Sequence, residues 1–171
     1  MEAWNYANLW ESVAAAAPDR PALIQGPRVI SYRDFDRRAN ALARRMLEAG
    51  VSHQSKVGAY LYNAPEYLES YFAAFKAGLA PFNINYRYGG EELTYLLDNA
   101  DAEVVVFHAS FAETANKVRP NLPKVKLWLA VPEPGVAIPD WAEDYEAVAA
   151  AGADRVVAPW GRSGDDIIMM Y

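Results

Sequence analysis

At 171 residues, with 53% hydrophobic and 22% charged side chains, the chain is long enough to bury a sizeable core and too apolar to be disordered. Its formal charge of −6 argues against non-specific binding to nucleic acid, because neutralising phosphates requires a surplus of Lys and Arg. The absence of cysteine excludes disulfides, thiolate catalysis and cysteine-ligated zinc.

The amino-terminal residues MEAWNYANLWES carry an acid, no basic run and no apolar run, so we expect no secretory signal peptide. No stretch of the chain approaches the roughly 18 consecutive apolar residues that a membrane span requires. We therefore expect a soluble, cytoplasmic protein.

The first half of the chain predicts alternating helices and short strands. The expected elements are a helix over Leu9–Ala17, a hairpin of Pro21–Gln25 and Arg28–Ser31, a helix from Ser31 or Tyr32 to Gly50, a strand over Lys56–Tyr62, a helix from Asn63 to Gly78 and a strand over Ala80–Asn85. In the long helix, apolar residues from Phe35 to Leu47 recur at helical spacing and define one face. Asp34 lies in its first turn, where a carboxylate interacts favourably with the helix dipole.

The second half continues the alternation. The expected elements are a helix over Gly90–Asn99, a strand over Glu103–His108, a helix over Phe111–Val118, a strand over Lys126–Val131, an acidic helix over Trp141–Ala151 and a last strand over Asp166–Tyr171. Short, uniformly apolar strands between helices indicate parallel pairing with both faces covered, and right-handed crossovers favour double winding. We therefore expect a single α/β domain over residues 1–171, with a mostly parallel doubly wound sheet and helices on both faces.

Few residues suggest catalysis. No dinucleotide or Walker-type glycine loop occurs, and the adjacent pair Gly89-Gly90 is followed by two glutamates, which fits a helix start better than a phosphate nest. His53 and His108, the only histidines, lie far apart and have no carboxylates at ligand spacing. Asp165-Asp166 reads as the polar entry to a buried strand. We expect no catalytic residue and no metal site within the chain.

Tyr86-Arg87-Tyr88 is the most unusual polar cluster. An arginine between two tyrosines can stack on their rings and offer a planar fork of donors to phosphate or carboxylate. The alternative is a surface corner in which Arg87 caps the preceding helix or pairs with Glu91 or Glu92. A second group, Tyr67, Tyr71, Phe72 and Phe75, forms an aromatic helix face that indicates core more strongly than an acyl pocket.

Three segments together carry a resemblance to a known family. Phe75–Tyr88 reads FKAGLAPFNINYRY, and its Lys76-Ala77-Gly78 resembles the "LKAG-x-x-x-P-x-N/D" motif of adenylate-forming (AMP-binding) enzymes. Some 45 residues earlier, Ile30–Phe35 (ISYRDF) is similar to the family's "(L/I)(T/S)Y-x-E/D-L" motif, with Phe for Leu. Asp165–Tyr171 resembles the strand before the family's phosphate loop. The N-x-N-Y-R form is most similar to bacterial acyl-CoA synthetases acting on fatty or other hydrophobic acids.

The resemblance implies that the chain is the N-terminal subdomain of an acyl-CoA synthetase, an incomplete enzyme ending just before the ATP phosphate-binding loop. Such a ligase converts a carboxylic acid, ATP and CoA to acyl-CoA, AMP and pyrophosphate through an acyl-adenylate, with Mg²⁺. The phosphate loop, adenine-binding motif, magnesium-site acid, hinge and catalytic lysine would all lie in the remainder of the ligase. The chain alone is therefore expected to be inactive and to bind none of ATP, Mg²⁺ or CoA tightly.

The resemblance also implies a contact with the CoA nucleotide. In related synthetases the loop after the KAG motif lies near this nucleotide, which by position points to Tyr86 and Arg87 within Asn85–Arg87, and to Lys117 or Arg119 as a second basic contribution. A homodimer is one possible oligomeric state of the parent enzyme, and the sequence leaves this question open. The alternative to the ligase is a self-contained small α/β binding or interaction domain without catalysis.

Overall fold

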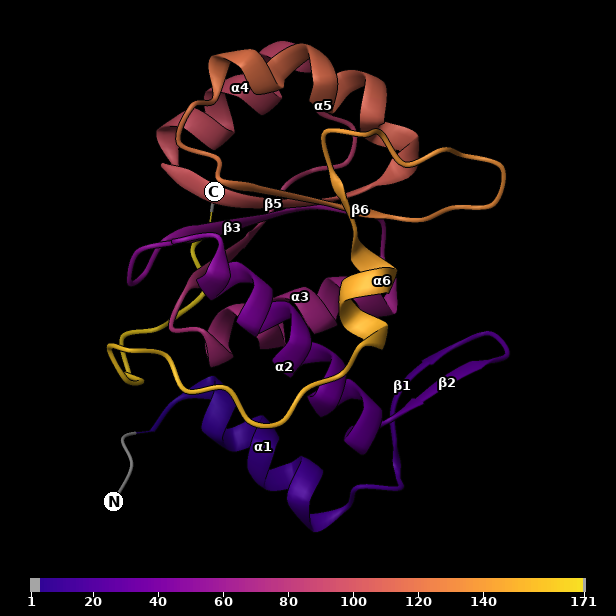
Figure 1. Cartoon of the computed structure of the whole chain (residues 1–171), viewed down its shortest axis with the longest axis vertical. Helices are drawn as coiled ribbons and strands as arrows, with labels where there is room; N and C mark the ends of the chain where they lie inside the picture. The colour runs from indigo at the N-terminus through magenta and orange to yellow at the C-terminus, as the bar shows by residue number, and fades with distance from the viewer. Residues whose placement is uncertain (1–3, 171) are drawn as a thin grey trace.

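The computed structural model describes residues 4–170 and has the expected α/β architecture (Figure 1). A central sheet of five parallel strands has the order β4-β3-β5-β6-β7, and a separate antiparallel hairpin joins β1 to β2. The strands are β1 (Pro21–Gln25), β2 (Arg28–Ser31), β3 (Lys56–Tyr60), β4 (Ala80–Asn83), β5 (Ala102–His108), β6 (Leu127–Val131) and β7 (Glu143–Asp144). The parallel pairing confirms the prediction made from short apolar strands.

Helices cover both faces of the sheet (Figure 1). One face is covered by α2 (Tyr32–Glu48), α3 (Pro65–Lys76) and α6 (Tyr145–Ala150), and the other by α4 (Gly90–Asn99) and α5 (Ala112–Val118). On the first side, α1 (Tyr6–Ala16) packs against α2 and α3. Successive strand residues point to opposite faces, so Val104 of β5 joins one core cluster and Val105 joins the other. The sheet is therefore doubly wound, as expected.

Local sequence signals set the ends of α2 and α4. The Ser31 side chain accepts a hydrogen bond from the Asp34 N–H at 3.1 Å, which caps the first turn of α2. Just after this helix, Gly50 has a φ of +76°, a conformation that glycine adopts without strain. The α4 helix begins and ends at the predicted residues.

The helix expected over Trp141–Ala151 is wrong in its first part. Glu143–Asp144 instead pairs with β6 as a short parallel strand, and the helix begins only at Tyr145. The Asp144 carboxylate accepts hydrogen bonds from the backbone N–H groups of Glu146 and Ala147, at 2.8 and 3.1 Å, and so caps the start of the helix. The Trp141 ring stacks on the Phe107 ring of β5, with 5.5 Å between the ring centroids. This contact holds the residues just before α6 against the sheet.

The strand expected over Asp166–Tyr171 is also wrong as far as the structure describes it, and Tyr171 lies outside the described residues. Only Met169 bridges to β4, with its N–H donating to the Pro81 carbonyl at 3.0 Å. A turn at residues 164–165, closed by the Asp166 N–H donating to the Ser163 carbonyl at 3.2 Å, lies directly before this segment. Within residues 4–170, every helix is too short or too polar to cross a lipid bilayer.

Candidate functional site

Two neighbouring strands send the chain to opposite faces of the sheet at their carboxyl ends. After β3 the chain enters α3 on one face, and after β5 it turns to α5 on the other (Figure 1). In doubly wound sheets such a switch point leaves a crevice outside the carboxyl ends of the strands, and ligands bind there. A site is therefore expected among the residues that follow β3, β4 and β5.

Four rings gather at this position and form what we call the switch-point cluster: Tyr62, Tyr86, His108 and Phe111. The Tyr62 ring is central, with its centroid 5.1 Å from the rings of both Tyr86 and His108. It also lies 4.8 Å from the Phe111 ring. Tyr62 and Tyr86 are each 39% exposed, so their rings can both rest on the protein and contact a ligand.

The loop after β4 presents Arg87 beside this cluster. Asn85 closes the loop: its side-chain oxygen accepts from the Arg87 N–H at 3.0 Å, and its carbonyl from the Tyr88 N–H at 2.9 Å. The Tyr60 hydroxyl donates to the Tyr88 carbonyl at 2.8 Å and fixes the loop to β3. The exposed Arg87 guanidinium lies 4.9 Å from the centroid of the Tyr86 ring, a cation–π arrangement. The structure therefore brings the predicted residues Tyr86 and Arg87 together.

The Arg87 guanidinium forms no ion pair with any residue in the described range. The predicted alternative, pairing with Glu91 or Glu92, is not observed. Glu92 instead accepts a hydrogen bond from the Gly89 N–H at 3.1 Å at the start of α4. A planar guanidinium without a carboxylate partner is suited to bind phosphate or carboxylate.

The two residues predicted as a second basic contribution have partners elsewhere. Lys117 pairs with Glu113 at 2.6 Å, and the Arg119 guanidinium lies 5.0 Å from the Trp141 ring centroid. Among the residues that the structure describes, no hydrogen bond, ion pair or ring contact joins Lys117 or Arg119 to the switch-point cluster or to Arg87.

His108 holds the two strands that flank the switch point. The Tyr62 N–H donates to His108 Nδ1 at 3.2 Å, which requires that nitrogen to be unprotonated. Burial lowers the pKa of His108 and so favours the neutral ring. His53 lies elsewhere, with Nε2 3.1 Å from Asp166 Oδ1. The described residues contain no cluster of three His, Asp or Glu that could hold a metal ion.

Tyr62, His108 and Phe111 were not predicted as site residues. The available signal was their position, at or just after the carboxyl ends of two predicted strands. What the sequence did not show was that β3 and β5 are neighbours, which is the condition that brings these rings together.

The aromatic face of α3 is mostly core, as its helical spacing favoured. Phe72 and Phe75 are buried against the Trp10 ring at 5.0 and 6.0 Å. Tyr67 and Tyr71 stack at 4.6 Å, and their hydroxyls are hydrogen-bonded at 2.7 Å.

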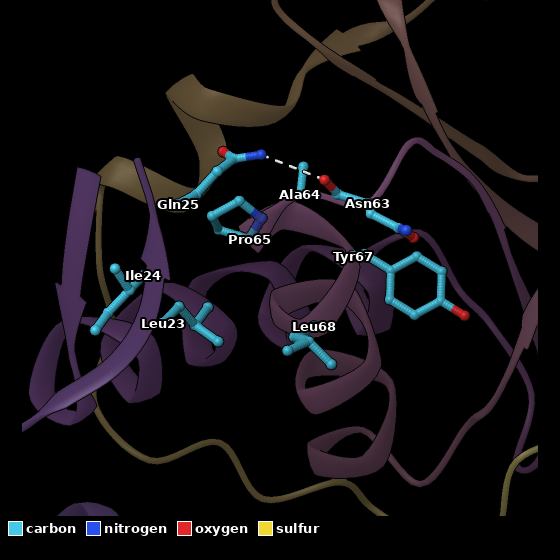
Figure 2. Close-up of a pocket in the computed structure, with 8 residues that line it drawn as sticks. All are labelled: Leu23, Ile24, Gln25, Asn63, Ala64, Pro65, Tyr67 and Leu68. Atoms are coloured by element: carbon cyan, nitrogen blue, oxygen red, sulfur yellow. Dashed lines mark hydrogen bonds between the residues drawn. The ribbon is translucent and has the colours of Figure 1, made fainter. Parts of the chain in front are cut away.

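A separate cavity of about 360 Å³ lies between β1 and the first turn of α3 (Figure 2). It is lined by Leu23, Ile24, Gln25, Asn63, Ala64, Pro65, Tyr67 and Leu68. The Gln25 side-chain amide donates to the Asn63 carbonyl at 3.3 Å at its rim. No charged side chain lines this cavity, so the switch-point cluster and Arg87 are better suited to bind a charged ligand.

Comparison with known proteins gives one consistent match. Residues 10–171 match the family described as AMP-binding enzyme. The medium-chain acyl-CoA ligase Mig of Mycobacterium avium is 35% identical over 175 residues, covering 94% of this chain and 32% of that protein. A medium/long-chain-fatty-acid--CoA/3-oxocholest-4-en-26-oate--CoA ligase of Mycobacterium marinum is 35% identical, covering 99% of this chain and 32% of that protein.

Solved structures agree on the fold. The chain superposes on a Mycobacterium tuberculosis fatty acyl CoA synthetase with a TM-score of 0.82 at 20% identity, covering 98% of this chain and 32% of that one. The chain therefore spans about a third of the length of the relatives it matches.

Proposed function

The chain belongs to the AMP-binding enzyme family, and from this we propose that it forms the amino-terminal part of an ATP-dependent acyl-CoA ligase. Its ligase relatives are named for medium- or long-chain acyl substrates. We therefore assign a fatty or other hydrophobic carboxylic acid as the substrate, with ATP and CoA. The remainder of the ligase is the proposed protein partner.

The proposed reaction has two steps. A carboxylate oxygen of the acid attacks the α-phosphorus of ATP, which forms the acyl-adenylate and releases pyrophosphate. The CoA thiol then attacks the acyl carbonyl carbon, which forms the thioester and expels AMP. Mg²⁺ bound with ATP supplies charge neutralisation. The resemblance to the family implies that the magnesium-site acid lies in the remainder of the ligase, and we assign the magnesium site there.

The contribution of this chain is contact with the CoA nucleotide. Arg87 would donate to a CoA phosphate, and the exposed faces of Tyr62 and Tyr86 would contact the adenine ring. The observation that carries this assignment is an exposed guanidinium without a carboxylate partner, beside exposed rings, at the switch point of the sheet.

Titration of the ¹⁵N-labelled chain with CoA tests the assignment. We expect amide shifts confined to residues 62, 86–88 and 108–111. Arg87→Ala should weaken CoA binding at least about tenfold, because a hydrogen bond to a charged group contributes about 1.5–3 kcal/mol. Arg44→Ala, at an exposed arginine of α2, serves as the matched control and should bind as the unchanged chain does. Equal affinity of the Arg87→Ala and unchanged chains would overturn the assignment.

The isolated chain is proposed to have no ligase activity. Incubated with ATP, Mg²⁺, a fatty acid and CoA, it should form neither acyl-adenylate nor acyl-CoA. Formation of either product by the pure chain would contradict the assignment of the catalytic groups to the remainder of the ligase.

A further inference from the structure

Residues 153–170, which we call the strap, cross the molecule without helix or extended strand. The strap leaves α6 and passes along α2 and α1 (Figure 1). Its end reaches β4, where Met169 bridges to Phe82. Ala153 and Val156 are nevertheless buried: the Ala153 N–H donates to the Arg37 carbonyl at 3.1 Å, and the Val156 N–H to Asn40 Oδ1 at 3.4 Å. A segment with so little regular structure needs specific side-chain contacts to hold this course.

Ala77 and Gly78 contact the strap directly. The indole N–H of Trp160 donates to the Ala77 carbonyl at 3.1 Å. Gly78 has a φ of +66°, and a Cβ placed there would overlap the indole nitrogen of Trp160 and lie 3.0 Å from its Cδ1. Glycine at this position therefore permits both the turn after α3 and the close approach of the indole. The His53 ring stacks on Trp160 at 5.5 Å.

Lys76 contacts the strap through one intermediate residue. Its ammonium group is 0% exposed and lies 2.6 Å from Glu11 and 2.8 Å from Asp36. Both carboxylate oxygens of Glu11 also accept from the guanidinium of Arg162, at 2.7 Å each. Lys76 therefore holds Glu11 in place for a bidentate bond with the strap.

The end of the strap is fixed beyond these contacts. The buried Asp166 carboxylate accepts from the Ser163 N–H at 2.8 Å, and its other oxygen lies 3.1 Å from His53 Nε2. Asn5 donates to the Ser163 carbonyl at 2.8 Å. Three residues after Asp166, the Met169 N–H donates to the Pro81 carbonyl of β4.

We infer that the Lys76-Ala77-Gly78 motif is a positioning element, which anchors the strap at Trp160 and Arg162 so that Met169 reaches the outer edge of β4. The contacts themselves are independent of any activity. Their consequence rests on the proposed function: in a ligase, the strap leads toward the phosphate loop, and its anchoring determines where that loop stands.

The test compares two glycines with positive φ in the 171-residue chain. A Cβ at Gly50, with a φ of +76°, meets nothing within 4 Å, so Gly50→Ala reproduces the backbone strain of Gly78→Ala without the clash. Hydrogen exchange measured by mass spectrometry should be at least about tenfold faster over residues 160–169 in Gly78→Ala and unchanged there in Gly50→Ala. In 5-fluorotryptophan-labelled chain, only the Trp160 resonance should move, toward its solvent-exposed position.

A coupled variant identifies the contact responsible. With Trp160→Ala as background, Gly78→Ala should add nothing further to exchange in the strap, because the clashing ring is gone. Should Gly78→Ala not fold, Trp160→Phe tests the same contact by removing the five-membered ring of the indole with its N–H while keeping an aromatic side chain, and exchange over 158–166 should rise while that of α3 stays constant. Equal strap exchange in Gly78→Ala and Gly50→Ala, or unchanged exchange in Trp160→Phe, would overturn the inference. None of these readouts uses CoA, so their failure leaves the CoA assignment standing.

Discussion

Buried charged side chains of this chain form ion pairs between different helices, which offset the desolvation free energy of an isolated buried charge. Arg38 of α2 donates to Glu69 of α3 and to Glu146 of α6, at 2.7 Å each. Burial lowers the pKa of Arg38, but the hydrogen bonds with Glu146 and Glu69 outweigh this and raise it. In the described part of the chain, no buried side-chain nitrogen or oxygen lacks a hydrogen-bond partner. These pairs fix the relative positions of the three helices.

Glu11 is the acid that joins Lys76 to the strap. Burial raises its pKa, but hydrogen bonds from Arg162 and Lys76 outweigh this effect and lower the pKa from 4.5 to about 2. Since the folded pKa lies below the unfolded one, the ionised carboxylate stabilises the fold above about pH 4.5. This stabilisation is lost as the pH falls toward about 2.

Glu11→Gln should therefore lower the free energy of unfolding at pH 7 by about 3 kcal/mol, the usual cost of removing one partner of a buried ion pair. The difference from the unchanged chain should shrink as the pH falls from about 4.5 to about 2. Urea unfolding at a series of pH values measures both effects. Glu113→Gln, at the exposed partner of Lys117, is the control and should leave stability unchanged. A Glu11→Gln deficit that stays constant with pH would contradict this account.

The sequence singled out Tyr86 and Arg87 because an arginine between two tyrosines is a local pattern and because it follows a family motif. Tyr62 and Phe111 carry no such local pattern. Their contact at 4.8 Å depends on a crossover that places β3 beside β5. Site residues that are adjacent in the sequence could therefore be predicted, whereas contacts between residues far apart in the sequence could not.

At the scale of elements, local signals predicted α2 and α4, since each has a helical apolar face and a defined start. Contacts distant in sequence decided two other segments. The residues before α6 were drawn into β7 by pairing with β6, and residues 166–170 pair with β4 only through the bridge at Met169. Helix propensity in the acidic, alanine-rich segment over residues 141–151 could not anticipate the first of these outcomes.

Asp144 is the boundary between β7 and α6. Asp144→Ala removes both hydrogen bonds to the first turn of the helix and should lower the free energy of unfolding by about 1 kcal/mol. Hydrogen exchange should accelerate first in α6. The exposed Asp140, which lies just before this region, provides the control: Asp140→Ala should change neither quantity. Equal effects of the two substitutions would show that Asp144 does not cap the helix.

At the scale of the whole molecule, several large apolar side chains remain exposed, among them Ile24 at 70%, Val29 at 58% and Met170 at 90%. A cavity of about 490 Å³ beside the end of the strap is lined mainly by aromatic and aliphatic side chains. Ile24 and Val29 are partners in the β1–β2 pairing, and Met170 lines the cavity, so the apolar side chains are exposed in two places. Exposed apolar patches often mark contact regions. This surface supports the proposal that the chain works as one part of a larger ligase.

The coding sequence beyond codon 171 tests that proposal most directly. We predict an in-frame continuation that encodes a Thr-, Ser- and Gly-rich, Lys-containing phosphate loop within a few residues of Tyr171, followed by the remainder of a ligase. A stop codon at that point would contradict the proposal, and would favour a self-contained α/β binding domain that shares the ligase fold but not its activity.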